Sequence, residues 1–406
     1  MKINKEASLT PKSKRPSDFS LKNARNLLGQ TSEYQPKVFV KTFGCQMNVR
    51  DSEVISGLLD RAGYKLVDDE AEAYVEILNT CSVRQLAEEK VWSAVGRSKA
   101  RIIGIVGCMA NNYREAIFEK APKVDFVVGT ADIAKLPNIL KEIEKHKGGC
   151  FEKKIYETDA DFRGDEIYHT GFHLDKEHAF VVISEGCENF CSYCVVPYVR
   201  GRLRSRDYND ILKEIKSDIE AGITKITLLG QNVNAYRYEK TDFVKLIGIV
   251  NSIKGLNEFG FVTSHPKDTS VELFLAMQEA DKLKKYLHLP IQSGSDKILK
   301  AMHRGYTRKY YLDLADKYRT IVTNGALTTD IIVGFPGETE NDFQETYDLV
   351  KNVEFDAGFI FKYSIRPHTE ATKLVDDVPK EEKERRHALI LELQKKISRK
   401  KNANNR

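Results

Sequence analysis

The chain has 406 residues, of which 41% are hydrophobic and 30% charged, so it can bury two or three cores and is neither disordered nor fibrous. No stretch reaches the roughly 18 apolar residues that span a bilayer, and the polar start lacks the apolar core of a signal peptide, so we expect a cytoplasmic protein without membrane segments. The net charge of +5 is uneven, since residues 1–37 and 394–406 are strongly basic while the rest is mildly acidic.

The first half of the chain predicts an arm, a domain and a linker. Residues 1–36 are polar and basic and are expected to be a disordered arm. Over 37–147, short apolar runs alternate with helical patterns, which predicts a doubly wound parallel α/β domain. Its four strand-like runs are VFVKTFG, AYVEILNT, RIIGIVG and VDFVVGT. Residues 148–176 show no sustained period and are interpreted as a linker.

The second half predicts a partial barrel. Six further apolar runs, each followed by a helical pattern, fit a partial (β/α)6 TIM-type barrel over 177–378, in which the loops after the strands carry the chemistry. The runs are AFVVISEG, KITLLGQN, FGFVTSH, YLHLPIQS, LTTDIIVGF and GFIFKYSI. Residues 379–406 are expected to form a charged helix and a basic tail. The two basic ends either gather RNA phosphates or only keep the chain in solution.

Six of the seven cysteines fall into two groups of three, which favours metal ligation over disulfides in a reducing compartment. We call Cys45, Cys81 and Cys108 the sheet triad, and Cys187, Cys191 and Cys194 the loop triad. The remaining Cys150 has no partner spacing and is interpreted as an incidental thiol.

The loop triad directly follows the first expected barrel strand. Three thiolates from one short loop would leave one iron of a four-iron cluster open to another molecule. The alternative is a zinc site with three cysteines and His169, His173 or His178 as the fourth ligand. Each member of the sheet triad follows a parallel strand, so all three are expected at one edge of the first sheet, where ligands bind. Buried core thiols are the alternative there.

The segment EGCENFCSYCVVPYVRGRLRSR resembles the cluster loop of radical S-adenosylmethionine (SAM) methylthiotransferases. The resemblance runs from Val38 to about Arg386 and includes KTFGCQMNVRDSE, ILNTCSVRQLAEEKV and VGCMA in the first domain. It implies that the loop triad holds a 4Fe-4S cluster whose open iron chelates SAM. It also implies that the sheet triad holds a second, auxiliary 4Fe-4S cluster.

Within that family, LLGQNVNAY, VTSHPKD, LHLPIQSGSDKILKAMHRGYT and DIIVGFPGETENDF resemble the branch that modifies tRNA. This implies conversion of N6-(dimethylallyl)adenosine at position 37 of tRNA to its 2-methylthio form, with the base splayed out of the anticodon loop. One SAM would methylate a sulfur on the auxiliary cluster. The second would give a 5′-deoxyadenosyl radical that takes hydrogen from C2 of the adenine. No catalytic residue beyond the clusters is expected.

The implied partners are tRNA and a low-potential electron donor such as flavodoxin or ferredoxin, and the chain is expected to be a monomer. Since the resemblance ends near Arg386, the small C-terminal RNA-binding β-barrel (TRAM) domain of the family is expected to be absent. Two rivals remain. One is a sibling enzyme acting on threonylcarbamoyladenosine in tRNA or on ribosomal protein S12. The other is a non-catalytic iron-sulfur protein that binds RNA or carries electrons, which would never cleave SAM.

Polar residues at the ends of the barrel strands are candidates for cofactor or substrate binding, with ordinary loop capping as the alternative. They are Gly230, Gln231 and Asn232 on the second strand, Ser264 and His265 on the third, and Gln292 and Ser293 on the fourth. Asp330 lies on the fifth strand, and the backbone of Val333 and Gly334 is expected against the SAM adenine.

Other candidates lie in or after the loops. Tyr193 is placed near the adenine by the resemblance, with simple packing as the alternative. Arg304 is a candidate for the SAM carboxylate because a guanidinium binds carboxylates in bidentate fashion; otherwise it is a solvated charge at a helix end. Four alternating arginines are candidates for tRNA phosphates or for the surroundings of the auxiliary cluster, or form a solvated strand edge. They are Arg200, Arg202, Arg204 and Arg206.

Overall fold

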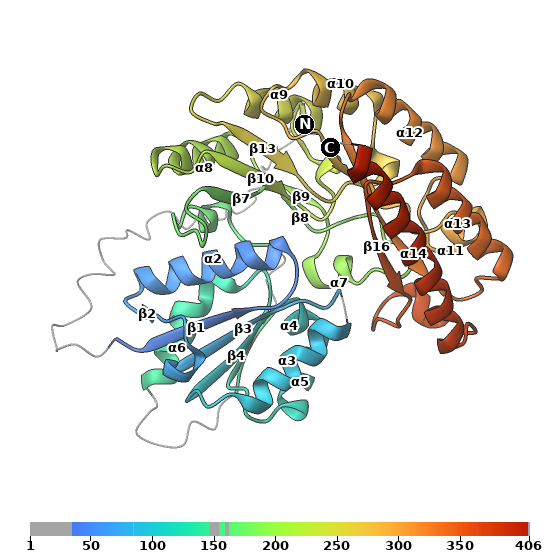
Figure 1. The fold of residues 1–406 in the computed structure, drawn as a ribbon. Coiled ribbons are helices and arrows are strands. Elements are labelled where there is room, and N and C mark those ends of the chain that lie inside the picture. The colour runs from blue at the N-terminus through green and yellow to red at the C-terminus, as the bar shows by residue number, and fades with distance from the viewer. Residues whose placement is uncertain (1–34, 84, 146–153, 159–161, 405–406) are drawn as a thin grey trace, which may run out of the picture.

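The computed structural model describes residues 35–83, 85–145, 154–158 and 162–404. Two α/β units are visible, a first one in blue and teal and a second one that runs from green to red (Figure 1). Cys150 and nearly all of the basic arm expected over 1–36 lie outside the described residues.

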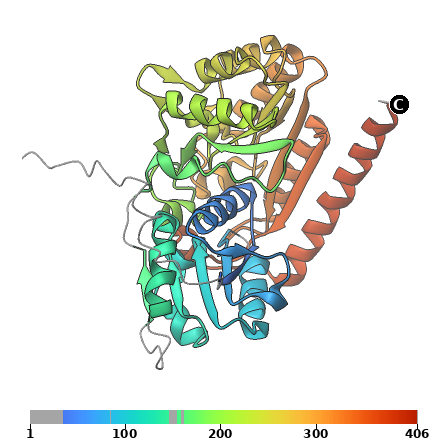
Figure 2. The ribbon, with the colours of Figure 1, turned by 90° about the vertical axis from the view of Figure 1, so that its left-hand side faces the viewer.

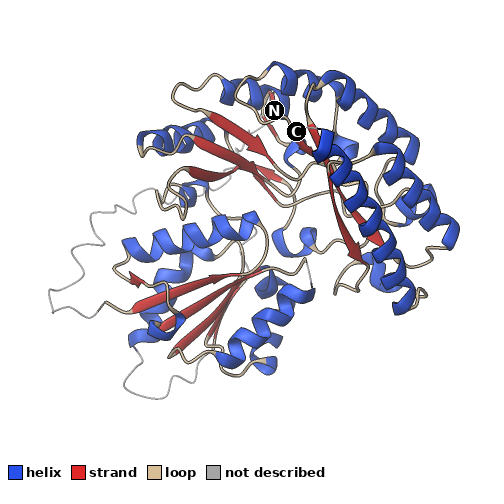
Figure 3. Ribbon diagram, in the orientation of Figure 1, coloured by secondary structure: helices blue, strands red, loops and turns tan. Residues whose placement is uncertain are grey.

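The first unit is built on a six-stranded, all-parallel sheet with the strand order β2-β1-β3-β4-β5-β6. Helices on both faces confirm the doubly wound arrangement (Figure 3). Every residue of β3 and β4 is buried, as expected for central strands covered on two sides. The strands are β1 (Lys37–Thr42), β2 (Lys65–Leu66), β3 (Val75–Thr80), β4 (Ile102–Gly107), β5 (Phe126–Val128) and β6 (Ile155–Glu157).

Two hydrophobic clusters cover the two faces of this sheet. One includes Val54 and Ile55 of α2 together with Ile139 and Leu140 of α6. The other includes residues of the helices on the opposite face. The helices are α2 (Gln46–Arg61), α3 (Gln85–Arg97), α4 (Cys108–Tyr113), α5 (Ala116–Lys120) and α6 (Leu136–Lys145).

The expected linker over 148–176 contains structure that the sequence did not indicate. β6 lies within it and pairs in parallel with β5, so it extends the first sheet. A short 3-10 helix, η3 (Asp165–Tyr168), follows. Both elements are only three or four residues long, too short to give a recognisable period in the sequence.

The second unit is the partial barrel. All six expected strands are present, as two parallel three-stranded sheets of order β13-β10-β7 and β14-β15-β16. An isolated parallel bridge joins Phe259 of β13 to Leu283, just before β14. The strands are β7 (His178–Val182), β10 (Lys225–Leu229), β13 (Glu258–Phe261), β14 (Tyr286–His288), β15 (Ala326–Val333) and β16 (Ala357–Lys362). The partial (β/α)6 barrel is therefore confirmed.

The barrel helices begin at residues suited to capping. Side chains of Asp207, Asp242, Ser270, Thr307 and Thr339 each accept a hydrogen bond from a backbone N–H in the first turn of the following helix. Such caps contribute about 1 kcal/mol each and fix where a helix starts. The helices are α8 (Tyr208–Glu220), α9 (Phe243–Asn251), α10 (Val271–Glu279), α11 (Asp296–Ala301), α12 (Arg308–Ile321) and α13 (Glu340–Val353).

Short elements decorate the strand ends. A pair of two-residue antiparallel strands, β8 and β9, flanks the loop triad, and a second pair, β11 and β12, precedes α9. These elements are β8 (Ser184–Glu185), α7 (Val196–Arg200), β9 (Arg204–Ser205), β11 (Arg237–Tyr238) and β12 (Thr241–Asp242). The remaining 3-10 turns are η1 (Glu70–Glu72), η2 (Ile133–Lys135), η4 (Val233–Ala235), η5 (Pro266–Asp268) and η6 (Glu370–Lys373).

The last helix, α14 (Lys380–Asn404), is longer than the sequence indicated, and it absorbs most of the expected basic tail (Figure 2). The Gln394 side-chain amide donates to the Phe355 carbonyl at 2.8 Å, and the Ser398 hydroxyl donates to the Asp356 carbonyl at 2.9 Å. Residues 394–401 therefore pack on the barrel rather than forming a free tail. No helix in the described part of the chain is both long and apolar enough for a membrane span.

Buried ion pairs join the two units. Arg50 of α2 is fully buried and donates to Glu214 of α8 at 2.9 Å. Asp51 accepts from Arg163 and from Arg200, each at 2.7 Å, and Arg163 also pairs with Glu185 of β8. Burial tends to raise the pKa of Asp51, but the two guanidinium groups outweigh burial and hold that pKa below its usual range. The orientation of the first unit on the barrel is thus fixed by directional contacts.

Candidate metal and cofactor site

The loop triad lies between β8 and α7, at the carboxyl end of the first barrel strand. The Cys187 N–H donates to the Gly201 carbonyl at 3.2 Å, and the Cys194 N–H donates to the Cys191 carbonyl at 2.9 Å. Gly186 has φ +72°, and a Cβ there would lie 2.0 Å from the Arg202 carbonyl oxygen. Only glycine therefore fits where the loop turns, and the turn gathers the three thiols in one place.

The three sulfurs are close enough to repel one another as thiolates. Burial raises the pKa of Cys187, and burial together with repulsion from Cys191 and Cys187 raises the pKa of Cys194 to about 12. Because ligating cysteines must be deprotonated, a strongly cationic centre is what would make such a group of thiolates favourable. The donor set therefore fits an iron-sulfur cluster.

Arg304 and His265 lie directly against Cys191. The Arg304 guanidinium is buried, 3.3 Å from the Cys191 sulfur and 3.4 Å from the Tyr193 hydroxyl. It is therefore not a solvated charge at a helix end. His265 has its Nε2 atom 3.9 Å from the same sulfur, and burial together with the Arg304 charge lowers its pKa far below the usual range. The imidazole is thus neutral beside the triad.

Tyr193 lies beside the site and contacts Arg304. Its ring is half-buried and packs on a small hydrophobic cluster that includes Met302 and Phe335. Its hydroxyl points to Arg304. Tyr193 therefore both packs on a hydrophobic cluster and lies beside the site.

Buried polar atoms without partners gather at the carboxyl ends of the barrel strands. Within the described residues, no hydrogen-bond partner is found for side-chain oxygens of Ser184, Gln231, Asn232, Ser264 and Gln292. Buried polar groups are nearly always satisfied, so five such atoms in one region indicate a polar ligand. Four of the five were predicted from the sequence, and Ser184 was missed.

The backbone in this region is also unusual. Gln292 has φ +71°, a conformation that few residues other than glycine adopt. A Cβ on Gly230 would lie 2.4 Å from the Ser184 hydroxyl oxygen, so glycine allows the second strand to end close to the first. Ser293 differs from its neighbours, because its hydroxyl is satisfied by that of Thr346 in α13, 3.3 Å away.

A cavity of about 230 Å³ lies beside the loop triad. The Asn232 side-chain amide donates to Asp268 at 2.6 Å on its wall, and Asn189 approaches the same carboxylate at 3.4 Å. A carboxylate with amide groups around it is suited to a ligand ammonium group. The lining residues are Cys187, Glu188, Asn189, Leu203, Asn232, Ala235, Lys267 and Asp268.

The backbone of β15 meets one other candidate, since the Gln292 N–H donates to the Asp330 carbonyl at 2.9 Å, but the side chains on β15 have other surroundings. Asp330 is half-exposed in the middle of the strand, with its carboxylate 3.4 Å from His288. Val333 is buried in the main barrel core. The Gly334 N–H donates to Glu338 at 2.6 Å, and a Cβ there would lie 2.3 Å from Lys383 of α14. The backbone of Gly334 is therefore covered by protein rather than open to an adenine.

The sheet triad is assembled at one edge of the first sheet, as expected. Cys45 caps α2 after β1, Cys81 follows β3, and Cys108 begins α4 after β4. These three strands are neighbours. Gly44 has φ +135°, and a Cβ there would lie 2.5 Å from the Cys81 Cβ. Burial, together with repulsion from Cys108 and Cys45, raises the pKa of Cys81 to about 12. Cys45 is exposed, so the triad opens to the surface instead of filling a core.

Two asparagines that the sequence analysis missed hold this triad in place. Asn79 and Asn48 are fully buried. The Asn79 amide donates to the Asn48 carbonyl at 2.8 Å, and the Asn48 amide donates to the Thr80 carbonyl at 2.9 Å. The available signal was their position, since Asn48 comes three residues after Cys45 and Asn79 two before Cys81.

The four alternating arginines have different surroundings. Arg206 is fully buried and pairs with Asp210 and, at 2.6 Å, with Glu214. Arg200 is buried between Asp51 and Cys108, where its charge opposes the effect of burial on the pKa of that thiol. The interpretation as a solvated strand edge is wrong for these two.

The other two arginines, Arg202 and Arg204, keep contact with solvent. Arg204 is half-buried and pairs with Asp165 at 2.6 Å and with Glu185 at 3.4 Å. Arg202 is exposed. Of the four, Arg202 alone has no ion pair within the described residues.

The histidines considered for a zinc site have other partners. His169 bonds to Asp210 at 2.7 Å, His173 to Asp218 at 2.9 Å and His178 to Thr227 at 2.8 Å. Across the described residues, no group of three His, Cys, Asp or Glu side chains is arranged to hold one metal ion. The thiolates of a four-iron cluster each bind a different iron, so they need not converge on one point. The zinc alternative has no support here.

Family comparisons divide the chain in the same way as the fold. Residues 181–350 match the Radical SAM superfamily, and residues 37–129 match the Uncharacterized protein family UPF0004. Among solved structures, the radical S-adenosylmethionine methyltransferase TsrM from Kitasatospora setae is similar with a TM-score of 0.57. It is 13% identical and the match covers 83% of this chain and 77% of that one, which is a likeness of fold alone.

Several curated proteins are similar over most of the chain. A protein of Carboxydothermus hydrogenoformans is 43% identical over 90% of this chain and 85% of its own length. One of Clostridium tetani is 44% identical over 94% and 86%. A third, from Clostridium botulinum strain Okra, is 45% identical over 90% and 82%. Each of the three carries the name tRNA-2-methylthio-N(6)-dimethylallyladenosine synthase.

Proposed function

Because the chain belongs to the family of tRNA-2-methylthio-N(6)-dimethylallyladenosine synthases, we propose that it converts N6-(dimethylallyl)adenosine at position 37 of tRNA to its 2-methylthio derivative. The protein is a radical SAM enzyme that works with two 4Fe-4S clusters and SAM. The observation that carries the proposal is the pair of cysteine triads, each at the carboxyl ends of parallel strands. A protein that only bound RNA or carried electrons would not need unsatisfied polar groups next to its cluster loop.

Each triad has a separate task. When bound, the cluster of the loop triad supplies the electron that splits SAM, and that of the sheet triad holds the sulfur to be transferred. The chain itself provides three thiolates in each place and thus leaves a position open at each cluster. The Asp51 ion pairs between the two units keep the triads at a fixed separation.

The SAM ligands are proposed residue by residue. The ammonium group binds near Asn232 and Asp268. Further polar contacts with SAM come from the ends of the neighbouring strands, at Gly230, Gln231, Ser264 and Gln292. Arg304 balances the charge of the loop triad or binds the SAM carboxylate, and Tyr193 lies beside the adenine. The contacts of Arg304 with Cys191 support this proposal. Asp330 and Val333 have weaker support, because Asp330 contacts His288 and Gly334, next to Val333, is covered by α14.

The partners follow from the proposed reaction. Reductive cleavage of SAM needs a low-potential one-electron donor such as flavodoxin or ferredoxin. The chain acts as a monomer in the cytoplasm, where its tRNA substrate is found. We also propose the division into residues 37–147 for the sheet triad, 177–378 for the radical SAM core, and the segment 148–176 as their connection.

The decisive experiment measures two products of the anaerobically reconstituted protein under dithionite. With SAM alone it should release 5′-deoxyadenosine, and with an isopentenylated anticodon stem-loop it should give the 2-methylthio nucleoside by mass spectrometry. Cys187→Ala should remove both products. Cys150→Ala is the matched control and should keep both. Release of 5′-deoxyadenosine by the Cys187 variant, or its absence from the intact protein, would overturn the proposal.

A further inference from the structure

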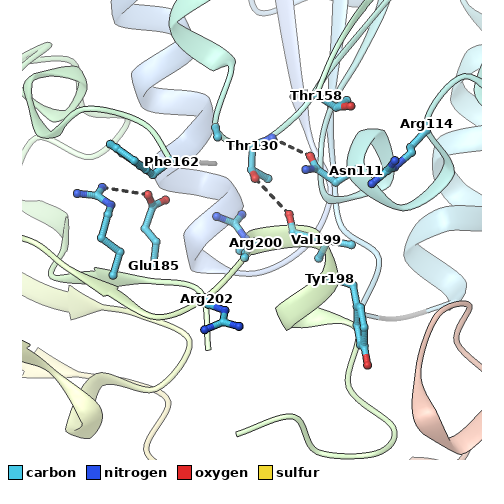
Figure 4. A pocket seen from close by; sticks show the side chains of 13 residues that line it. Asn111, Arg114, Thr130, Thr158, Phe162, Glu185, Tyr198, Val199, Arg200 and Arg202 are labelled. Atoms are coloured by element: carbon cyan, nitrogen blue, oxygen red, sulfur yellow. Dashed lines mark hydrogen bonds and ion pairs between the residues drawn. The ribbon is translucent and has the colours of Figure 1, made fainter. Parts of the chain in front are cut away.

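A second cavity, of about 310 Å³, lies between the two units and apart from the barrel mouth. It is lined by the end of α4, by residues just after β5, by Thr158 and Phe162, and by the chain from α7 to β9 (Figure 4). Nothing in the proposed reaction of SAM uses it. The lining residues are Asn111, Arg114, Thr130, Ala131, Thr158, Phe162, Glu185, Tyr198, Val199, Arg200, Gly201, Arg202 and Arg204.

The cavity carries an excess of positive charge. Its one acid, Glu185, pairs with Arg163 and Arg204. Arg114 and Arg202 are exposed and have no ion pair within the described residues, so their charges are free for a ligand. Arginine on either side of a cavity is suited to the oxygens of a phosphate group.

Arg200, which lines this cavity and also lies beside Cys108, has a buried donor atom without a geometric hydrogen-bond partner. Arg200 lines the cavity, its side chain is only 4% exposed, and its Nη2 atom is used by Asp51. Its Nη1 atom is buried and has no hydrogen-bond partner among the described residues. A buried guanidinium N–H left unsatisfied is costly, so an acceptor from a ligand would complete its surroundings.

An exposed aromatic ring adjoins these arginines. Tyr198 is 40% exposed and meets the ring of Phe190 edge to face, with the centroids 6.3 Å apart. Exposed aromatic rings next to positive charge are the usual means of holding unpaired nucleotides, because every base has a face that stacks. A free small anion would have no use for such a ring.

We propose that this cavity binds one phosphodiester group of the RNA substrate between Arg114 and Arg202, with the neighbouring base against Tyr198. The inference rests on the proposed function and adds a subsite to it. The location agrees, since Asn111 of the cavity is in the same short helix as Cys108, and Val199 contacts that cysteine. A nucleotide held here lies next to the sheet triad while the target base enters the barrel.

The test is a salt titration of anticodon stem-loop affinity by fluorescence anisotropy, with full-length reconstituted protein. The test variant is Arg114→Gln/Arg202→Gln. The matched control is Arg101→Gln/Lys309→Gln, which removes two charges from the opposite end of the first sheet and from an outer barrel helix. Iron content and melting temperature verify that every variant is folded. Tyr198→Ala and Tyr198→Phe form a second, uncharged pair.

The double arginine variant should bind about tenfold more weakly near 50 mM salt, and the slope of log K against log salt should fall by about 0.7, the effect of one single-stranded phosphate. Tyr198→Ala should weaken binding about tenfold, whereas Tyr198→Phe should retain it, because stacking needs only the ring. The control variant should match the intact protein.

A slope in the test variant equal to that of the control would overturn the subsite. The subsite would also be overturned if inorganic phosphate, compared with chloride at the same ionic strength, bound in the cavity without displacing RNA. The cavity would then serve a free anion. Failure of the proposed function looks different. In that case the intact protein would make no 2-methylthio product, whatever the variants do to RNA affinity.

Discussion

Replacing Asp51 by asparagine should destabilise the protein far more than an equivalent change at the surface. Asp51 is fully buried and is the counter-charge of both Arg163 and Arg200, each at 2.7 Å. Asn keeps the shape and removes the charge, which leaves Arg200 buried without an ion pair. Breaking a buried pair in this way costs about 3–5 kcal/mol. With about 2.1 cal/mol/K per residue over 406 residues, the melting temperature should fall by about 4–6 °C.

The assay is differential scanning calorimetry of the apoprotein, with Glu72→Gln as the control. Glu72 pairs with Lys37 at 2.6 Å, but both side chains are about half-exposed, so this change should cost less than about 1 kcal/mol. The folded-state pKa of Asp51 is lowered, so its contribution is present above the unfolded pKa of about 4 and is lost as pH falls through the folded value. The gap between wild type and Asp51→Asn should therefore narrow on acidification. An Asp51→Asn protein as stable as Glu72→Gln would refute the reasoning.

Three further predictions concern the clusters and SAM. Because each triad supplies three thiolates, reconstituted protein should hold about eight irons, and changing the loop triad to alanine should halve that number in an iron assay; an unchanged count would contradict the assignment. Changing the sheet triad to alanine should leave release of 5′-deoxyadenosine measurable but remove the methylthio product, and normal product yield would exclude a role in sulfur transfer. Because Asp268 faces the cavity beside Cys187, Asp268→Asn should weaken SAM binding about tenfold in equilibrium dialysis, while Asp348→Asn on the exposed side of α13 should not.

Much of the fold was predictable because its signals are local. Each of the six barrel strands is a run of apolar residues, and five of them are followed by a helix with a capping residue, such as Asp207 before α8. β6 was missed because three residues carry no period, and it is recognisable only through its pairing with β5. The end of α14 was taken for a tail because its many charges suggested solvent, whereas Gln394 and Ser398 on one face dock on the chain after α13.

The functional site was likewise predictable only in part. The two triads were predictable because a residue that follows a parallel strand always lies at the same edge of its sheet. The ion pairs of Asp51 were not, because Arg163 is 112 positions away in the sequence and Arg200 is 149 away. Burial likewise separates Arg206 from Arg202, although both belong to the same alternating run. The charge pattern does not predict burial, so the sequence left the same alternatives open for four residues that have different surroundings.

The buried ion pairs between the two units affect how the enzyme responds to dissolved salt. Buried ion pairs are little affected by dissolved salt, whereas contacts with phosphates weaken steeply as salt rises. The separation of the two triads should therefore be insensitive to salt, whereas the affinity for RNA should depend on it. Raising the ionic strength should increase KM for RNA and leave kcat almost constant, because the two triads keep their relative position while RNA binds more weakly.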